Sequence, residues 1–247
     1  MAQKSKHKTK SVYSIVERRK NLGGNLNFAA SEAYKLLRTN LIFSMSDESE
    51  CKIIGITSAL RSEGKSTTSL NLAYTMAQTE KKVLLIEADM RIPVMSRLLK
   101  ISGVPGLSHV LAGVNSLNDA VKKIDLAPNL YTVFAGTIPP NPAELLCSNK
   151  MKTIVATLSK TFDYIIIDLP PINAVSDGLA VSKLLSGMVV VVRQDYCDQY
   201  ALAEAMRQLE FLNVKVLGFV YNDAKVSKGR YKKYSKKYGK YNSKYYE

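Results

Sequence analysis

The chain has 247 residues, and its 35 lysines and arginines against 21 acidic residues give a formal net charge of +14. The whole excess lies at the two ends, because residues 1–20 carry +6 and residues 225–247 carry +8, while residues 21–224 contain 19 basic and 19 acidic side chains. This distribution argues against a basic folded face of the kind that binds nucleic acid. It predicts a basic flexible arm over residues 1–27, a balanced domain over 28–224 and a basic, disordered tail over 225–247.

Cysteine usage and hydropathy exclude several classes of protein. Cys51, Cys147 and Cys197 show no CxxC spacing, and the chain has only two histidines, so we expect reduced thiols and no zinc site. No apolar run approaches the roughly 18 residues of a membrane span. The basic N-terminus lacks the apolar stretch of a signal peptide. We therefore expect a cytoplasmic chain that reaches a membrane only through another molecule.

Short apolar runs alternate with helical patterns along the domain. In chain order we expect a helix over 32–43, an acidic turn over 46–50, a strand over 52–58, a helix over 65–78, strands over 82–89 and 129–135, a proline-rich turn over 136–146, a helix over 149–161, a strand over 163–168, a helix over 177–185, a strand over 188–193, a helix over 201–212 and a strand over 214–221. Strands that are apolar along their whole length, separated by helices, predict a doubly wound, mostly parallel α/β sheet.

A phosphate-binding loop follows the first predicted strand. The sequence GKST, residues 64–67, lies between this strand and a helix, as a P-loop requires. Backbone amides and the helix N-terminus would face the phosphates, Lys65 would reach the β/γ oxygens, and the Ser66 hydroxyl would ligate Mg²⁺. The first glycine of the usual pattern is replaced by Ala59. The residues expected to contact ATP are Ser62, Glu63, Gly64, Lys65, Ser66, Thr67 and Arg91.

Carboxylates stand at the ends of two further predicted strands. Asp168 ends YIIID, where a Walker B carboxylate would orient the water shell of Mg²⁺. Asp89 ends VLLIEAD, and Glu87 precedes it by two residues on the same face. Because open α/β sheets bind ligands at the carboxyl ends of their strands, these groups are expected to meet the P-loop. Two alternatives stay open: the carboxylates cap the following segments, and Arg91 pairs with Asp89 instead of a phosphate.

The tail is rich in tyrosine and lysine and holds no aliphatic residue after position 230. Its tyrosines are Tyr231, Tyr234, Tyr238, Tyr241, Tyr245 and Tyr246. With nothing apolar around them, their hydroxyls rather than their rings are the expected functional groups, which makes them candidate phosphoacceptors. Five or six phosphates would add roughly −8 to −12 charges and cancel or reverse the basic charge of the tail. Their 3–4 spacing also fits a helix-docking stripe, and basic aromatic segments also stack on single-stranded nucleic acid.

Together GKST, EADMR, IIIDLPP, the turn GTIPPNPAELL and the tyrosine tail resemble the bacterial tyrosine kinases over about residues 30–247. That family uses Walker A, A′ and B motifs. The resemblance implies Mg²⁺- and ATP-dependent autophosphorylation of the tail, in trans within a ring-like homo-oligomer. It also implies a separate transmembrane activator of the polysaccharide co-polymerase type at the inner face of the cell membrane, protein substrates in the polysaccharide pathway, and control of capsule or exopolysaccharide assembly. No specific nucleic acid is expected.

By position, the resemblance assigns a catalytic role to four residues, Lys65, Glu87, Asp89 and Asp168. It assigns binding of the metal ion to Ser66, Asp89 and Asp168. Glu87 stands where the family usually has aspartate, and Arg61-Ser62 stand where it usually has Pro-Gly. The helical segment Glu32, Lys35 and Arg38 is similar to the oligomerisation motif of the family, with Lys35 in place of arginine. Residues three apart share one helix face, so these three predict an intersubunit patch or an ordinary solvated face.

Two other classes of protein fit part of the pattern. Partitioning or positioning ATPases share the deviant P-loop but carry an early lysine, where this chain has Ala59-Leu60-Arg61. ATP hydrolysis without transfer to tyrosine would favour that class. A nucleotide-gated adaptor would use the tail to bind anionic membrane or nucleic acid. Salt-sensitive binding that survives replacement of every tail tyrosine by phenylalanine would favour the adaptor.

Overall fold

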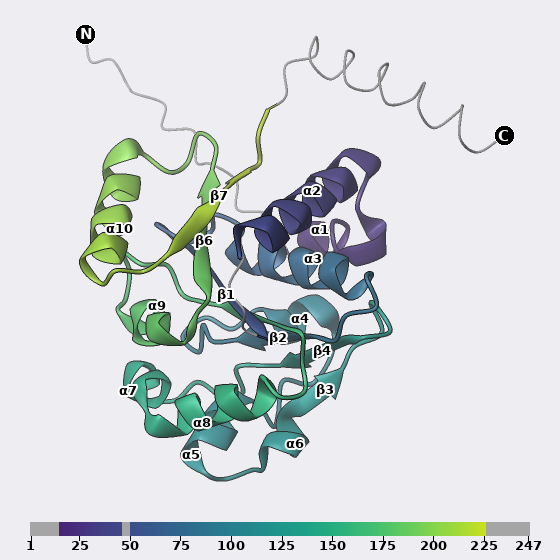
Figure 1. Ribbon diagram of the computed structural model, residues 1–247, viewed down its shortest axis with the longest axis vertical. Helices are drawn as coiled ribbons and strands as arrows, with labels where there is room; N and C mark the ends of the chain where they lie inside the picture. Colours follow the sequence, from purple (N-terminus) through teal and green to yellow (C-terminus); the bar gives the residue numbers. More distant parts are fainter. Residues whose placement is uncertain (1–14, 46–49, 226–247) are drawn as a thin grey trace, which may run out of the picture.

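The computed structural model describes residues 15–45 and 50–225, and a twisted sheet forms its centre (Figure 1). The strands are β1 Lys52–Ser58, β2 Val83–Glu87, β3 Val121–Lys123, β4 Leu130–Val133, β5 Tyr164–Asp168, β6 Gly187–Arg193 and β7 Val216–Asn222. Their order is β3-β4-β2-β5-β1-β6-β7, and every neighbouring pair is parallel except the antiparallel pair β3 and β4. The predicted doubly wound, mostly parallel sheet is confirmed.

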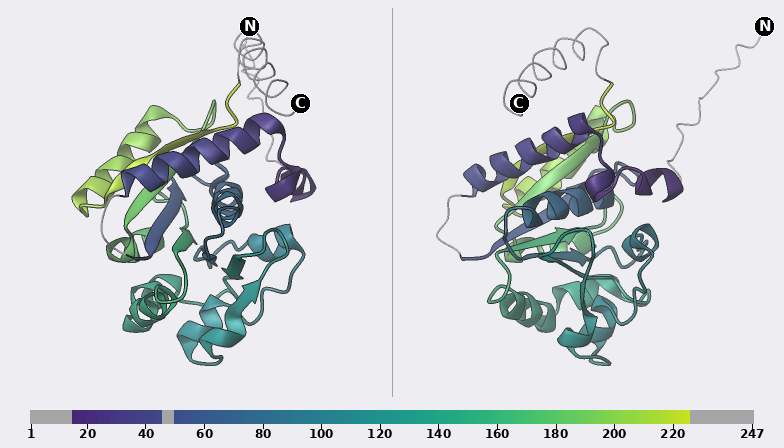
Figure 2. Two further views of the ribbon diagram at one scale, coloured as in Figure 1. Left: turned by 45° about the vertical axis from the view of Figure 1, so that its right-hand side comes forward. Right: turned by 90° about the vertical axis from the view of Figure 1, so that its right-hand side faces the viewer.

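Helices cover both faces of the sheet (Figure 2). They are α1 Ile15–Arg19, η1 Gly23–Asn25, α2 Phe28–Ser44, α3 Lys65–Ala77, α4 Met95–Leu99, α5 Leu107–Ala112, α6 Leu117–Ala120, α7 Pro142–Cys147, α8 Asn149–Leu158, α9 Asp177–Ala180, η2 Ser182–Leu184 and α10 Gln199–Phe211. One core cluster joins the sheet to α2, α3 and α4, and the other joins it to α5, α7, α8 and α10. Among the described residues, no helix is long and apolar enough to cross a bilayer.

The apolar strands are buried on both sides, as their sequences require. In β5, Ile166 contributes to the cluster under α3, whereas Ile165 and Ile167 contribute to the cluster on the opposite face. This alternation follows from the two-residue period of a strand. The central order β2-β5-β1 places three carboxyl ends side by side, with Glu87 in register with Asp168 and Asp168 in register with Ile56. The strand ends that the motifs occupy are therefore neighbours.

The N-terminal segment differs from the prediction. Residues 15–27 were expected in a flexible arm, but Leu22 is buried, and the Asn71 side chain on α3 bonds the backbone of Asn21 and Gly23. Burial of a leucine and two backbone hydrogen bonds outweigh the polar composition that suggested an arm. The folded part of the chain therefore starts before residue 28.

Other differences concern short elements. The proline-rich turn contains α7, because a proline is compatible with the first turn of a helix. The helix expected over 177–185 is split into α9 and η2, where Gly178 and Ser182 lower the helix propensity. No element was expected between residues 90 and 128, where the structure has α4, α5, α6 and β3. The acidic turn and the tail lie mostly outside the described residues.

Candidate nucleotide-binding and phosphotransfer site

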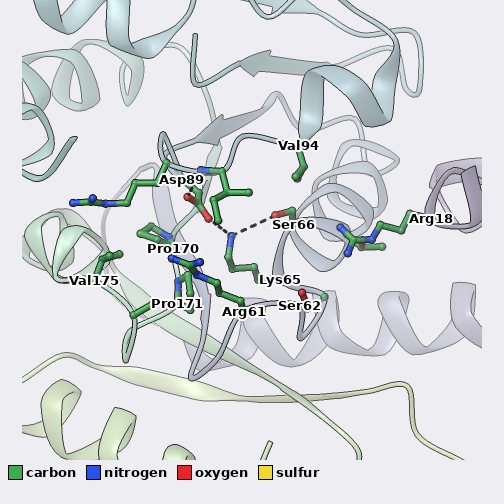
Figure 3. Close-up of a pocket in the computed structure, with 15 residues that line it drawn as sticks. Arg18, Arg61, Ser62, Lys65, Ser66, Asp89, Val94, Pro170, Pro171 and Val175 are labelled. Carbon is green, nitrogen blue, oxygen red and sulfur yellow. Dashed lines mark hydrogen bonds and ion pairs between the residues drawn. The ribbon is translucent and has the colours of Figure 1, made fainter. Parts of the chain in front are cut away.

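A pocket lies at the carboxyl edge of the sheet, where the predicted P-loop meets the loops after β2 and β5 (Figure 3). Ser62, Gly64 and the start of α3 form one wall, and Asp89, Arg91 and Ile92 come from the loop after β2. Pro170, Pro171 and Val175 from the loop after β5 supply an apolar wall. The structure thus combines charged groups with an apolar surface in one cavity.

Lys65 lies at the centre of this pocket. Its Nζ is 2.7 Å from Asp89 Oδ2 and 3.9 Å from Asp168 Oδ2 (Figure 3). Burial acts to lower the pKa of Lys65, but the carboxylates of Asp168 and Asp89 outweigh it and raise the pKa above its ordinary value. The ammonium group is therefore charged and is held by the two carboxylates.

Asp168 fits the expected magnesium position. It is fully buried at the end of β5, and its Oδ1 accepts a hydrogen bond from Ser69 at 3.1 Å. Its Oδ2 has no hydrogen-bond partner among the described residues. Burial raises the pKa of Asp168, against the opposing effect of Lys65. Because Mg²⁺ takes one or two carboxylates together with phosphate and water oxygens, Asp168 and the neighbouring Ser66 hydroxyl suit this ion.

The P-loop reaches its geometry without the usual glycines. Ser62 has φ 63°, so a serine adopts the left-handed conformation at the position where Pro-Gly is usual in the resembling family. Gly64 has φ 98°, and a Cβ there would lie 2.1 Å from Asn222 Nδ2. Only glycine therefore fits at position 64. Ala59, in place of the first glycine, is fully buried in the core.

Hydrogen bonds of Glu63 and Asn222 fix the P-loop on its protein side. The Glu63 carboxylate accepts from the amides of Leu60 at 2.6 Å and Arg193 at 3.2 Å, and Asn222 Nδ2 donates to the Glu63 carbonyl at 2.7 Å. The pKa of the nearby Cys197 thiol is raised to about 12, mainly by burial and next by the negative charge of Glu63. Glu63 was expected to contact ATP, but its side chain lies beneath the loop instead.

Glu87 and Asp89 have different surroundings, although both were expected to face the phosphates. Glu87 Oε1 accepts from the amides of Val94 at 2.6 Å and Met95 at 2.8 Å, and Oε2 accepts from Ala135 at 3.1 Å. Both its oxygens thus hold backbone at the start of α4 and the end of β4. Asp89 lines the pocket and contacts Lys65 directly. The Asp89 carboxylate is the one that faces the cavity.

Arg91 forms a bidentate pair with Asp177 at the start of α9. Nε is 2.7 Å from Oδ2, and Nη2 is 3.0 Å from Oδ1. The hydrogen bond to Asp177 is the main cause of the raised pKa of Arg91. The structure therefore pairs Arg91 with Asp177 and not with Asp89, while the predicted contact with a phosphate stays a prediction. Arg91 nevertheless lines the pocket, where its guanidinium has room to meet a ligand.

Comparison with known proteins agrees with this site. Residues 51–216 match the family model described as an AAA domain. Over 198 residues the chain is 39% identical to the tyrosine-protein kinase YwqD of Bacillus subtilis. The matched region covers 80% of this chain and 83% of that relative. The chain belongs to the bacterial tyrosine kinase family. The kinase is of the short type, since the match spans most of both chains.

Solved structures support the same assignment for the kinase. The kinase domain of the Escherichia coli tyrosine kinase ETK has a TM-score of 0.77 and 32% identity, covering 85% of this chain and 82% of that one. The chimerical protein CapA2B2 has a TM-score of 0.75 and 30% identity, covering 79% and 85%. The septum site-determining protein MinD of Pyrococcus horikoshii has a TM-score of 0.60 at 23% identity, over 72% of each chain, and shows the shared P-loop fold alone.

The predicted oligomerisation residues of the kinase do not form one exposed patch. Glu32 and Lys35 pair at 2.7 Å on the outer face of α2, where each side chain is about half exposed. Arg38 turns inward and donates from Nη1 to the Thr75 carbonyl on α3 at 2.7 Å. Only the first two side chains are thus exposed together on the surface of α2, and their role in oligomerisation stays a prediction. The six tail tyrosines lie outside the described residues.

Several site residues escaped the sequence analysis. Arg18 lines the pocket from α1, a segment expected to belong to an arm. Asn222 and Arg193 support the P-loop from the ends of β7 and β6. Asn222 directly follows the strand predicted over 214–221, and a polar residue at that place was a usable signal in a sheet whose other strand ends carry the site. Arg18 had no such signal, because only packing brings its helix to the pocket.

Proposed function

We propose that the kinase transfers the γ-phosphoryl group of ATP to the tyrosines of its own tail, in trans between the copies of a homo-oligomer. One observation carries the proposal: Lys65, Asp89 and Asp168 converge from three strand ends in one pocket. The tail supplies six tyrosines among lysines, whose positive charge favours approach to a site with buried carboxylates and a bound polyphosphate.

In the transfer, the tyrosine oxygen bonds the γ-phosphorus as the bond from that phosphorus to the β–γ bridging oxygen breaks, and ADP leaves. Lys65 and the loop amides stabilise the negative charge of the transition state. Tyrosine has an ordinary pKa near 10, so its hydroxyl needs an acceptor for its proton. Asp89 takes this role once Lys65 has moved to the phosphates, because the oxygens of Glu87 are engaged by amides.

Ser66 and Asp168 would hold Mg²⁺, while Asp89, also predicted as a metal ligand, contacts the Lys65 ammonium that lies between the two aspartates. The ion would supply charge neutralisation on the β- and γ-phosphates. Asp168 Oδ2, which has no hydrogen-bond partner among the described residues and only the longer ion pair to Lys65, supports this assignment. Ser62, Gly64, Thr67 and the backbone of Glu63 would cradle the phosphate chain from the P-loop.

We assign the pathway and the partners on the same basis. The likeness to CapA2B2 supports a transmembrane activator of CapA type as a separate polypeptide, and hence action at the inner face of the cell membrane. Capsule or exopolysaccharide polymerisation and export is the process that the kinase would regulate. Phosphorylation would convert the tail from positive to neutral or negative, which offers a graded control of association with the membrane or with other copies.

The test uses the full chain with Mg²⁺ and ATP, with and without a cytoplasmic segment of an activator, and maps phosphotyrosine by mass spectrometry. We expect tail phosphotyrosine from the wild type and none from Lys65→Met, while Lys160→Met, an exposed lysine, behaves as the wild type. ATP hydrolysis without any phosphotyrosine would overturn the proposal and favour a positioning-type ATPase.

The trans arrangement has its own test. Lys65→Met, which keeps the tail tyrosines, is mixed with a variant that keeps Lys65 but has phenylalanine at all six tail positions. Phosphate should appear on the Lys65→Met chain. A mixture without phosphotyrosine, when the wild type alone modifies itself, would show transfer in cis.

A further inference from the structure

The segment that precedes α2 is fastened to α3 and α4, and one of its side chains lines the nucleotide pocket. We call residues 15–27 the N-terminal strap. The Asn71 side chain donates to the Asn21 carbonyl and accepts from the Gly23 amide, each at 2.9 Å, which fixes the strap to α3. Arg19 Nε donates to the Leu98 carbonyl at 3.2 Å, which fixes it to α4. These two anchors, on α3 and α4, give the strap a set position on the fold.

Arg18 is the strap residue that enters the pocket. Figure 3 shows its side chain extending toward Lys65 and Ser66, from the side opposite Asp89. It lines the cavity together with Ser62 and Val94. The next residue, Arg19, points to α4 instead. Arg19 thus anchors the strap to α4, whereas Arg18 lines the pocket.

The guanidinium of Arg18 has no partner among the residues that the structure describes. Its pKa is lowered by burial and by repulsion from Arg193 and Arg97. An arginine stays charged in proteins even so. Arg18 is a half-buried cation that is repelled by its neighbours, and it lines the same pocket as Lys65, Ser66 and Thr67 at the start of α3. An anion would be favoured there, and a helix N-terminus is where phosphates bind.

We propose that Arg18 binds the phosphate chain of the nucleotide, so that the N-terminal strap completes the site that the P-loop begins. The inference rests on the proposed ATP site and adds a residue to it. The planar guanidinium suits phosphate oxygens, to which it can donate two parallel hydrogen bonds. The expected ligand is therefore the phosphate chain itself, independent of the adenine base.

The experiment measures the binding of a fluorescent ADP to the full-length protein with Mg²⁺, and its displacement by ATP and by inorganic tripolyphosphate. Arg18→Gln should weaken all three ligands roughly tenfold or more, as expected for loss of a charge-assisted hydrogen bond. The affinities of Arg18→Lys for the three ligands should lie between those of Arg18→Gln and those of the wild type. Lys20→Gln removes the same charge from an exposed position two residues along and should leave the three affinities within about twofold.

Each other outcome is informative. Equal affinities for wild type and Arg18→Gln would overturn the inference while leaving the ATP site intact. A loss confined to ADP and ATP, with tripolyphosphate unchanged, would overturn the assignment to the phosphate chain. A lower melting temperature of nucleotide-free Arg18→Gln, accompanying weaker binding, would indicate a structural role and also overturn it. If the wild type bound none of the ligands, the proposed function would fail first.

Discussion

At the scale of single residues, the P-loop contains a strained backbone conformation at Ser62, where glycine is usual in the family. Ser62 has φ 63°, a left-handed conformation in which the Cβ atom of an L-residue is crowded. Glycine adopts this conformation freely but loses more entropy on folding than serine does. The first effect is about 1–2 kcal/mol and the second about 0.5–1 kcal/mol, so the strain is the larger.

We therefore predict that Ser62→Gly raises the free energy of unfolding by about 0.5–1 kcal/mol. Urea unfolding followed by circular dichroism measures the change. Ser62→Ala is the matched control, because it removes the hydroxyl but keeps the Cβ atom, and it should not stabilise the protein. Equal stabilisation by alanine and glycine would show that the hydroxyl, and not the backbone, is the source of the effect.

Glu87 is a second residue whose departure from the family pattern has a structural reason. Its carboxylate reaches the amides of Val94, Met95 and Ala135, and thereby joins the start of α4 to the end of β4. The extra methylene, relative to aspartate, supplies the reach for contacts on two elements. Glu87 is therefore a structural carboxylate in this state, whereas Asp89 faces the reaction.

The pH dependence of stability tests this role. Burial raises the pKa of Glu87, although the three amides oppose it. The folded chain then holds a proton that the unfolded chain loses near pH 4.3, so the contribution of Glu87 is complete below that pH and falls as pH rises through the folded pKa. Relative to Glu87→Gln, the wild type should lose stability from about pH 4 upward.

The measurement compares urea unfolding of wild type and Glu87→Gln between about pH 4 and about pH 7. At the lower pH the glutamine variant should already be less stable by about 1–3 kcal/mol, because its NH₂ group faces amide donors. Glu210→Gln, on the exposed face of α10, should give a curve parallel to the wild type. Parallel curves for Glu87→Gln would contradict the argument.

At the scale of elements, the end of β7 supports the P-loop directly. Asn222 bonds the Glu63 carbonyl and lies against Gly64, while Arg193 at the end of β6 pairs with Asp223 at 3.0 Å. The tail begins three residues after Asn222. The nucleotide loop and the root of the tail thus share one hydrogen-bonded junction.

Asn222→Ala should therefore weaken nucleotide binding about fivefold, equivalent to about 1 kcal/mol for one lost hydrogen bond. Titration of fluorescent ADP measures it. Tyr221→Ala, one residue earlier and exposed, is the control and should bind as the wild type does. If both variants lose affinity equally, the cause is the strand as a whole, and the junction at Asn222 has no special role.

The elements that could be predicted are those with a strong local pattern. Strand β1 was expected over its observed bounds, and α3 and β5 differed by one residue at one end. The short elements α4, α5 and α6 were missed because four to six residues hold too little periodic signal. Helix α1 was missed because it has only five residues with a basic end, and its position depends on the packing of Ile15 against the core.

At the scale of the whole molecule, the sequence by itself determined the parallel α/β sheet and the position of the P-loop between its first strand and the following helix. Residue types in local patterns suffice for these features. Only the tertiary structure decided that Asp89 faces the pocket while Glu87 holds backbone, and that Arg18 lines the site. Those assignments depend on which amides and which distant segments pack beside each side chain, and such contacts leave no local trace in the sequence.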